Sequence, residues 1–251
     1  MSSFDVSEQD LSYVGEELKL FAEARIWKGY VARQVAPFLG SDVLEVGAGL
    51  GATAAALLPA ASTGGLRRWV CLEPDPKLRR ELTRRIRTGG LAAECEAASG
   101  TIASLPEESA FDTILYMDVL EHIEDDDHEV EMAVRRLRPG GHLVVLAPAH
   151  DALFTPFDEA VGHFRRYDRS KMRRLSSSTA RLVRLRYLDC VGLAASAGNR
   201  FVLSSAMPSS RQLWVWDRIM VRASKWLDPL FGYRLGKSVL GVWRRGAEDD
   251  S

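Results

Sequence analysis

The sequence predicts an α/β fold in which helices cover both faces of a doubly wound, mostly parallel sheet. Two observations predict it. Short apolar runs alternate with amphipathic or alanine-rich segments from residue 43 to residue 147, and strands that alternate with helices build a parallel sheet. The first apolar run, residues 43–46, leads into the glycine-rich residues 47–51 and then into an alanine-rich segment. That order is typical of a strand, a tight turn and a helix start.

Seven segments have the apolar content or alternation of strands. They are residues 43–46, 69–72, 92–98, 111–122, 143–147, 180–189 and 238–245, and residues 137–141 are predicted as the turn that leads to the fifth. In such a sheet, ligands bind at the carboxyl ends of the strands.

Helices are expected between these strands because apolar residues recur there at helical spacing. The expected helices are residues 16–39, 52–58, 77–87, a helix that starts at the acidic residues 124–127, residues 170–175, and residues 211–230. Asp75 before Pro76 and Asp168 before Arg169 are predicted helix N-caps.

Length and composition indicate one globular domain. The 251 residues are 46% hydrophobic and 27% charged with a net charge of -1, which suits a single large core and argues against a nucleic-acid partner. Within this domain, 1-251, we expect an N-terminal helical segment (1-40), cap insertions (150-170 and 193-237) that cover the carboxyl edge of the sheet, and a disordered tail (246-251).

The three cysteines lie far apart and form no C-x-x-C pair, which indicates a reduced, cytoplasmic protein. The N-terminus lacks a basic region followed by an apolar core, and no segment is long and apolar enough to cross a membrane. We therefore expect a cytoplasmic protein without stable membrane insertion.

Glu45 is the most informative residue of the first strand. A carboxylate within a strand that is covered on both faces is costly unless a cation or hydrogen-bond donors satisfy it. Gly47, Gly49 and Ala52 also fit the loose dinucleotide pattern G-x-G-x-x-G/A, so the glycine spacing alone does not decide between cofactors. An acid before the first glycine favours a cofactor with a cationic amino-acid tail over a pyrophosphate.

Residues 45–51, E-V-G-A-G-L-G, resemble the first motif of class I methyltransferases that use S-adenosylmethionine. The resemblance extends over residues 27–245 and is strongest up to Tyr167. It implies a Rossmann-like fold, a last strand paired antiparallel at the sheet edge, and S-adenosylmethionine as the cofactor. The residues that it places around the cofactor in this turn are Glu45, Gly47, Ala48, Gly49 and Gly51.

Glu73 and Pro74 follow the second strand, about twenty residues beyond the glycines, where an acid accepts both hydroxyls of a ribose. We predict that Glu73 binds the ribose, because Asp75 is the better helix cap. At the end of the third strand, relatives often carry an acid for the adenine amino group. This sequence departs from that pattern with Gly100 and Thr101, so backbone groups or the Thr101 hydroxyl take that role.

The fourth strand ends in Asp118-Val119-Leu120-Glu121-His122, which resembles the family's motif at this point. Asp118 and Val119 are expected to line the cofactor pocket. In similar methyltransferases an upstream aromatic or basic residue encloses the methionine part of the cofactor. Arg25, Trp27 and Tyr30 are candidates here, and core packing is the alternative for them.

A dense polar stretch follows the fifth strand, and its residues 162–167 match a G-H-x-R-R-Y signature of a bacterial small-molecule subfamily. Insertions at this point cover the cleft in that fold, so we expect the stretch to form the substrate side. Arg165 and Arg166 either clamp an anionic group or form ion pairs with Asp158 and Asp168. The expected substrate-binding residues are His150, Phe154, Asp158, Phe164, Arg165, Arg166 and Tyr167.

All five histidines lie between His122 and His163. His122, His150 and His163 are expected to converge at the carboxyl edge of the sheet. No tight ligand spacing such as H-E-x-x-H is present, so we predict no metal. A neutral imidazole is a suitable base for a hydroxyl or an amine, and His163 is the first choice and His122 the second.

The predicted helix 211–230 carries tryptophans and the basic residues Arg218, Arg222 and Lys225. It either packs over the cleft, forms a homodimer contact, or offers a surface to a lipid or membrane-bound substrate. The predicted function is O- or N-methylation of a small molecule, either a natural product or a metabolite. The alternatives are a lipid-linked or membrane-associated substrate, an NAD(P)-dependent reductase, and a non-enzymatic cofactor-binding protein.

Overall fold

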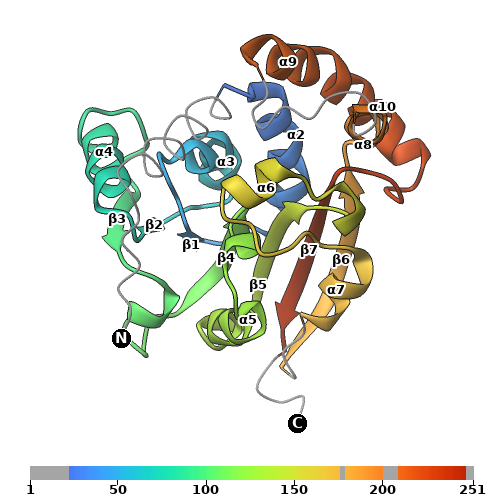
Figure 1. Cartoon of the computed structure of the whole chain (residues 1–251). Helices are drawn as coiled ribbons and strands as arrows, with labels where there is room; N and C mark the ends of the chain where they lie inside the picture. Colours follow the sequence, from blue (N-terminus) through green and yellow to red (C-terminus); the bar gives the residue numbers. More distant parts are fainter. Residues whose placement is uncertain (1–22, 176–178, 200–208, 247–251) are drawn as a thin grey trace, which may run out of the picture.

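The computed structural model describes residues 23–175, 179–199 and 209–246, and it confirms the predicted fold class. One sheet has the strand order β3-β2-β1-β4-β5-β7-β6 (Figure 1). Strands β1 to β5 are parallel to one another, whereas β7 is antiparallel to both β5 and β6. The strands are β1 Asp42–Val46, β2 Arg68–Glu73, β3 Cys95–Ser99, β4 Phe111–Met117, β5 Leu137–Pro148, β6 Ala180–Leu188 and β7 Ser238–Arg245.

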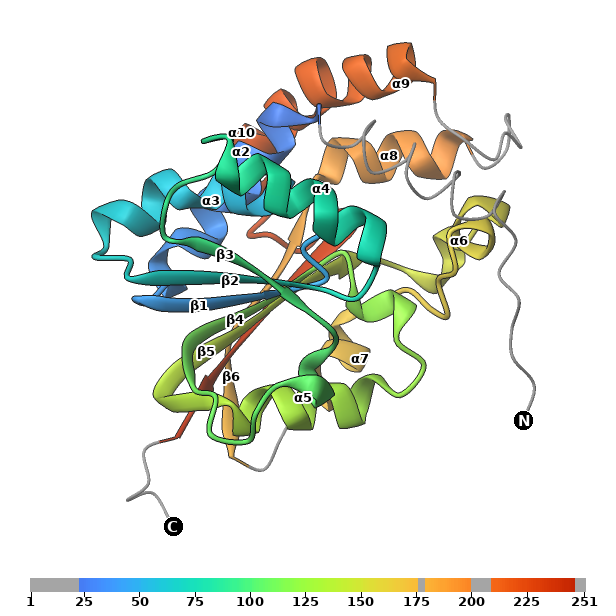
Figure 2. The same ribbon diagram turned by 90° about the vertical axis from the view of Figure 1, so that its left-hand side faces the viewer.

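Helices cover both faces of the sheet (Figure 2). On one face lie α2 Arg25–Val35, α3 Ala52–Thr63, α4 Pro76–Arg87, α8 Cys190–Asn199, α9 Ser210–Val215 and α10 Val221–Leu230, and on the other lie α5 Asp126–Arg135 and α7 Arg169–Arg174. The short α6 Pro156–Ala160 belongs to the segment after β5. Further short helices are η1 Ala36–Phe38, η2 Ile102–Ser104, η3 Leu120–His122, η4 Asp151–Leu153 and the π-helical η5 Trp216–Met220.

The core consists of two apolar clusters, one on each face of the sheet, because successive strand residues point to opposite faces. In β1, Val43 packs with the cluster under α2 and α3, whereas Leu44 and Val46 pack with the cluster over α5. Both faces are therefore buried, and Glu45 lies among apolar neighbours as the sequence predicted.

The position of β7 corrects one expectation. It lies between β5 and β6 and not at the sheet edge, and β6 is the edge strand. Residues 238–243 of β7 are all buried, as a strand with two neighbours requires, whereas β6 has exposed residues at alternate positions in its first half.

Two other boundaries differ from the prediction. The predicted turn at residues 137–141 lies inside β5, where the pairing with β4 shifts between Phe111 and Thr113. Strand β3 begins at Cys95 because the amide of Cys95 still bonds the carbonyl of Ala92 in a turn. The predicted helix over residues 16–39 and the tail 246–251 lie partly outside the described residues. Within them, α2 starts at Arg25.

The predicted helix 211–230 is present as α9, η5 and α10, with a π-helical segment in its middle. Buried aspartates join it to its neighbours. Asp217 accepts hydrogen bonds from the amides of Ile26 (3.2 Å) and Trp27 (2.8 Å) at the start of α2. Amides at a helix start have no partner within the helix, so Asp217 fixes the start of α2.

Asp228 makes the second connection. Its carboxylate has no exposed surface and accepts hydrogen bonds from the Tyr30 hydroxyl (2.7 Å) and the amides of Asp189 (2.7 Å) and Cys190 (2.9 Å). The side chain of Asp189 in turn accepts from the Trp216 indole (2.7 Å). Through these aspartates, η5 and α10 hold α2 against the sheet. No helix of the described residues has the length and apolarity needed to cross a membrane.

Candidate active site

The glycine turn lies at the carboxyl end of β1, between the ends of β2 and β4. The amides of Gly47 and Ala48 donate to the carbonyl of Leu72 at 2.9 and 3.1 Å. Gly47 has φ +67°, and a Cβ at this position would lie 2.7 Å from a methyl group of Val119. A side chain at residue 47 would therefore clash with the residue that follows Asp118.

Glu73 connects this turn to the end of β2. One carboxylate oxygen accepts the amide of Gly49 at 2.7 Å and the other accepts the amide of Asp75 at 2.9 Å. Asp75 caps α4 through the amides of Lys77 and Leu78, which confirms the cap predicted from the sequence. Glu73 is thus not the helix cap, and its carboxylate lies beside the glycine turn.

Glu45 is only 2% exposed, and it accepts a hydrogen bond from the Trp69 indole at 2.9 Å. Burial raises the pKa of Glu45 to about 7, against the opposing effects of the Trp69 hydrogen bond and the positive charge of Lys28. The charge of this group therefore changes near neutral pH.

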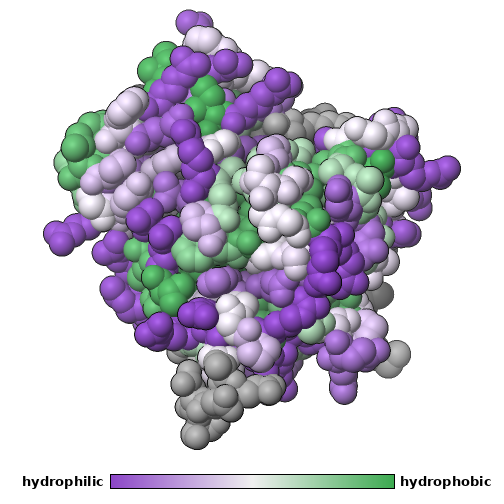
Figure 3. Space-filling model, turned by 180° about the vertical axis from the view of Figure 1, so that it is seen from behind, coloured by the Kyte–Doolittle hydropathy of each residue, from purple (hydrophilic) through white to green (hydrophobic). Residues whose placement is uncertain are grey.

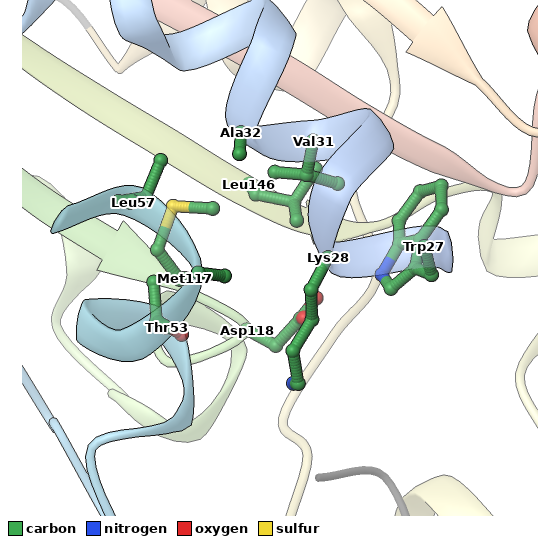
Figure 4. Close-up of a pocket in the computed structure, with 10 residues that line it drawn as sticks. Trp27, Lys28, Val31, Ala32, Thr53, Leu57, Met117, Asp118 and Leu146 are labelled. Carbon is green, nitrogen blue, oxygen red and sulfur yellow. The ribbon is translucent and has the colours of Figure 1, made fainter. Parts of the chain in front are cut away.

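A pocket opens beside Glu45, between α2, α3 and the end of β4 (Figure 4). Asp118 and Lys28 lie side by side in it, and Trp27 stands at one side. Burial lowers the pKa of Lys28, although the charge of Asp118 opposes this shift. The lining residues are Trp27, Lys28, Val31, Ala32, Thr53, Ala56, Leu57, Met117, Asp118 and Leu146.

Sequence reasoning missed Lys28, although it lies in the same predicted helix as the candidates Arg25, Trp27 and Tyr30. The three upstream candidates have different positions. Trp27 lines the pocket, whereas the Tyr30 hydroxyl bonds Asp228 and Arg25 is exposed. These positions favour core packing for Tyr30. At the end of β3, the amide of Gly100 donates to the carbonyl of Glu73 at 3.4 Å and Thr101 is exposed.

His122 and His163 form a pair, with ring centroids 4.5 Å apart. His122 ends η3 after β4, and His163 follows α6. Nδ1 of His163 lies 2.9 Å from a carboxylate oxygen of Asp158, and Nε2 lies 4.0 Å from Oε1 of Glu121. His150 does not join them, because its Nε2 is 2.9 Å from the carbonyl of Gly236 and its ring packs on Tyr187. Of the three histidines expected to converge, the structure brings two together.

The carboxylates around this pair differ in charge. Asp158 has no exposed surface, and burial alone would raise its pKa. Hydrogen bonds from His163 and Arg166 nevertheless hold the pKa of Asp158 below its ordinary range, so it is ionised. Burial raises the pKa of Glu121 well above its ordinary value, with the charge of Asp118 adding to the effect. Burial of the imidazole, with the effect of the neighbouring His163, lowers the pKa of His122 to about 4, although the residue as a whole is exposed.

The two arginines of the G-H-x-R-R-Y stretch are engaged in ion pairs. Arg166 binds both oxygens of Asp158 at 2.8 and 2.9 Å, and Arg165 binds Asp126 at 2.6 Å. Tyr167 is 1% exposed, and its hydroxyl donates to Asp126 at 2.6 Å. This arrangement favours the ion-pair interpretation over an anion clamp and gives Asp158 and Tyr167 structural roles. The partner of Arg165 is Asp126 in place of the expected Asp168, which caps α7. Of the two phenylalanines expected to meet the substrate, Phe164 is exposed and Phe154 is half-buried.

We therefore expect Arg166→Ala to lower the free energy of unfolding by about 3 kcal/mol, because it leaves a buried carboxylate without its cation. Chemical denaturation measures this loss. The exposed Arg173, changed to alanine, is the control and should shift stability by no more than about 0.5 kcal/mol. An Arg166→Ala protein with unchanged stability but a raised KM would instead support the anion clamp.

Known proteins resemble this chain in part of its sequence and in its fold. A family model described as a methyltransferase domain matches residues 44–145, which include the glycine turn, Glu73, Asp118 and His122. No curated protein matches the sequence. Residues 44–145 thus match a methyltransferase domain, and the match indicates S-adenosylmethionine as the cofactor.

Solved structures are similar in fold. A chain from the complex between the Haloferax volcanii Trm112 methyltransferase activator and a methyltransferase is 16% identical with a TM-score of 0.65, over 96% of this chain and 100% of that one. Coclaurine N-methyltransferase, bound to N-methylheliamine and SAH, is 16% identical with a TM-score of 0.59, over 89% and 73%. The [4+2]-cyclase SpnF is also 16% identical with a TM-score of 0.59, over 87% and 81%. The fold is thus shared by proteins with different reactions.

Proposed function

We propose that this protein transfers the methyl group of S-adenosylmethionine to an oxygen or nitrogen atom of a small molecule. The observation that carries the proposal is the arrangement at the carboxyl edge of the sheet. The Glu73 carboxylate accepts a hydrogen bond from the amide of Gly49 in the glycine turn. Asp118, directly after β4, lines the pocket. His163, in the segment after β5, is hydrogen-bonded to the ionised Asp158.

The proposed cofactor position follows from the hydrogen-bonding groups. Glu73 has acceptor capacity left after its two amide bonds, since each carboxylate oxygen accepts more than one hydrogen bond, and it takes the ribose hydroxyls. The glycine turn brings the backbone close to the cofactor. Asp118 and Glu45 supply the negative charge for the cationic methionine part. Val119, Gly100 and Thr101 are assigned to the adenine side.

The proposed reaction needs little covalent assistance from the protein, because the cofactor supplies an activated methyl group. The chain must align the nucleophile and accept its proton. An ionised Asp158 at 2.9 Å from Nδ1 of His163 favours the tautomer with the proton on Nδ1. Nε2 is then a free acceptor that faces the cleft between His122 and Glu121. His163 is our proposed base, with His122 the second candidate.

The pKa of Glu45 leads to a pH prediction for cofactor binding. A carboxyl group with a pKa of about 7 is neutral below that pH and charged above it, and only the charged form attracts a cationic tail. The affinity for S-adenosylhomocysteine should therefore rise as the pH increases from about 6 to about 8. Calorimetry at several pH values measures this rise. In Glu45→Gln the rise should be absent, and a rise that persists there would assign the titration to another group.

Methyl transfer itself is tested with S-adenosylmethionine that carries a labelled methyl group and a panel of small hydroxyl and amine compounds. Label in an organic product supports the proposal. A protein that oxidises NADPH would be a reductase, the rival enzyme class. Cofactor binding without transfer to any compound of the panel would favour the non-enzymatic alternative.

One observation favours a lipid-linked substrate as a second candidate. Large exposed apolar side chains are concentrated between residues 214 and 235, and Figure 3 shows apolar residues among hydrophilic ones on this part of the surface. They are Trp214, Ile219, Trp226, Leu230, Phe231 and Leu235. The exposed Arg218 and Arg222 lie on the same helical segment. Tryptophans with basic residues suit an anionic membrane surface.

Sedimentation with vesicles tests this candidate. Binding to anionic vesicles that is lost in Trp226→Ser, while neutral vesicles are not bound, would support it. If the wild-type protein stays in solution with both kinds of vesicle and forms a dimer by light scattering, the surface is a contact between two copies of the chain.

A further inference from the structure

Three potential ligand side chains meet in the cleft, although the sequence separates them. Glu121 and His122 come from η3, and His163 comes from the loop after α6. One ligand atom from each of these residues lies within 4.8 Å of those from the other two. A base needs only one imidazole and the carboxylate that orients it. In the proposed function, His163 is the base and Asp158 orients it. Proton transfer therefore does not explain why Glu121 and His122 lie beside His163.

Glu121 is the clearest sign of a missing partner. Its side chain is 1% exposed, and within the described part of the chain Oε2 has no hydrogen-bond partner. Its other oxygen is 4.0 Å from Nε2 of His163, which is too far for a hydrogen bond. A buried carboxylate oxygen without a partner is costly, and a cation between Glu121 and the imidazoles would supply the partner of Oε2.

Both imidazoles are held by hydrogen bonds. Nδ1 of His163 is held by Asp158 at 2.9 Å, and the His122 ring forms hydrogen bonds with the backbone of Val161 and Gly162. Histidines that bind metals usually donate their other N–H group to a carboxylate or a backbone carbonyl in this way. Nε2 of His163 is therefore left for an ion, and the His122 ring lies beside it.

We infer that Glu121, His122 and His163 bind one divalent transition-metal ion, such as Zn²⁺ or Mn²⁺. Two imidazoles and one carboxylate suit these ions. Bonds of about 2.1 Å to a tetrahedral ion place the ligand atoms about 3.4 Å apart. The three ligand atoms lie within 4.8 Å of one another, so each pair has to approach by at most about 1.4 Å. His122 is solvent-exposed, which leaves a path for the ion and an open coordination position toward the cleft.

The role of this ion rests on the proposed function, whereas its binding does not. A substrate hydroxyl on the ion has a lowered pKa and loses its proton to water. Its oxygen then attacks the methyl carbon, the carbon–sulfur bond breaks, and the bond's electrons stay on the sulfur. His163 acts in this form as a ligand in place of the base, and the metal ion performs the activation.

The test begins with protein freed of metal by a chelator and titrated with Zn²⁺ and Mn²⁺ by calorimetry, and with Co²⁺ by visible absorption. We expect one ion per chain and absorption bands of a nitrogen-coordinated Co²⁺. His122→Gln and the double variant with His163→Gln should weaken binding by about 100-fold or more. The matched control is His128→Gln, because His128 is exposed on α5 outside the cluster, and it should bind as the wild-type protein does.

Wild-type protein that binds no ion below millimolar concentration would overturn the inference, as would a double variant that binds as well as the wild type. If His163→Gln does not fold, the exposed His122→Gln alone decides. S-adenosylhomocysteine binding is measured in parallel. Intact cofactor binding and methyl transfer without metal binding would overturn the metal site and leave the proposed function standing.

Discussion

His163→Ala should lower turnover by about 10²–10⁴-fold, the usual contribution of a positioned acid–base group. The expected loss has the same direction whether His163 is a base or a metal ligand, because both roles use Nε2. The dissociation constant of S-adenosylhomocysteine should stay unchanged, since the cofactor site is assigned to the glycine turn and to Glu73. Single-turnover methyl transfer with a compound found in the panel assay measures the effect.

The control for this prediction is His128→Ala, which should keep the wild-type rate. His163 also bonds the buried Asp158, so each variant is checked by thermal unfolding. If the His163→Ala protein folds, binds the cofactor and turns over at the wild-type rate, the assignment fails and alignment of the substrate alone must suffice.

Asp228→Ala should produce the largest loss of stability, about 3–5 kcal/mol in the free energy of unfolding. The substitution leaves three buried donors unpaired, namely the Tyr30 hydroxyl and the amides of Asp189 and Cys190, and each such donor costs about 1–3 kcal/mol. Because these donors belong to α2 and to the start of α8, the cofactor affinity should fall as well. Denaturant unfolding and calorimetry measure the two effects.

Asp228→Asn keeps one acceptor oxygen and should lose less stability than Asp228→Ala. The exposed Glu107, changed to alanine, is the control and should alter stability by no more than about 0.5 kcal/mol. If Asp228→Ala has the same free energy of unfolding as the wild-type protein, α10 does not hold α2 in the way that the hydrogen bonds indicate.

The strands and the glycine turn could be predicted because each depends on local sequence. Apolar runs, the turn at Gly47 and the cap at Asp75 are all short-range features. The place of β7 could not be predicted in the same way, since its apolar pattern does not specify which strands lie beside it. Its burial on both sides became visible only in the sheet.

The candidate site was less predictable because most of its contacts join segments that are far apart in the sequence. Asp158 and Arg166 are an exception: they are near in sequence, so an ion pair was one of the two predicted interpretations, but only the structure distinguishes it from an anion clamp. The contact of Glu121 with His163, the pocket position of Lys28 and the hydrogen bonds of Asp228 each join segments that are far apart in the chain. A single acid or lysine in the sequence gives no signal of such a partner.

The central claim is that the pocket beside the glycine turn binds S-adenosylmethionine, and isothermal titration tests it most directly. The account predicts micromolar-range binding of S-adenosylmethionine and S-adenosylhomocysteine to the wild-type protein, binding that is lost in Glu73→Ala, and no heat with NADH or NADPH. Tight binding of NADPH, with no binding of either adenosyl compound, would contradict it.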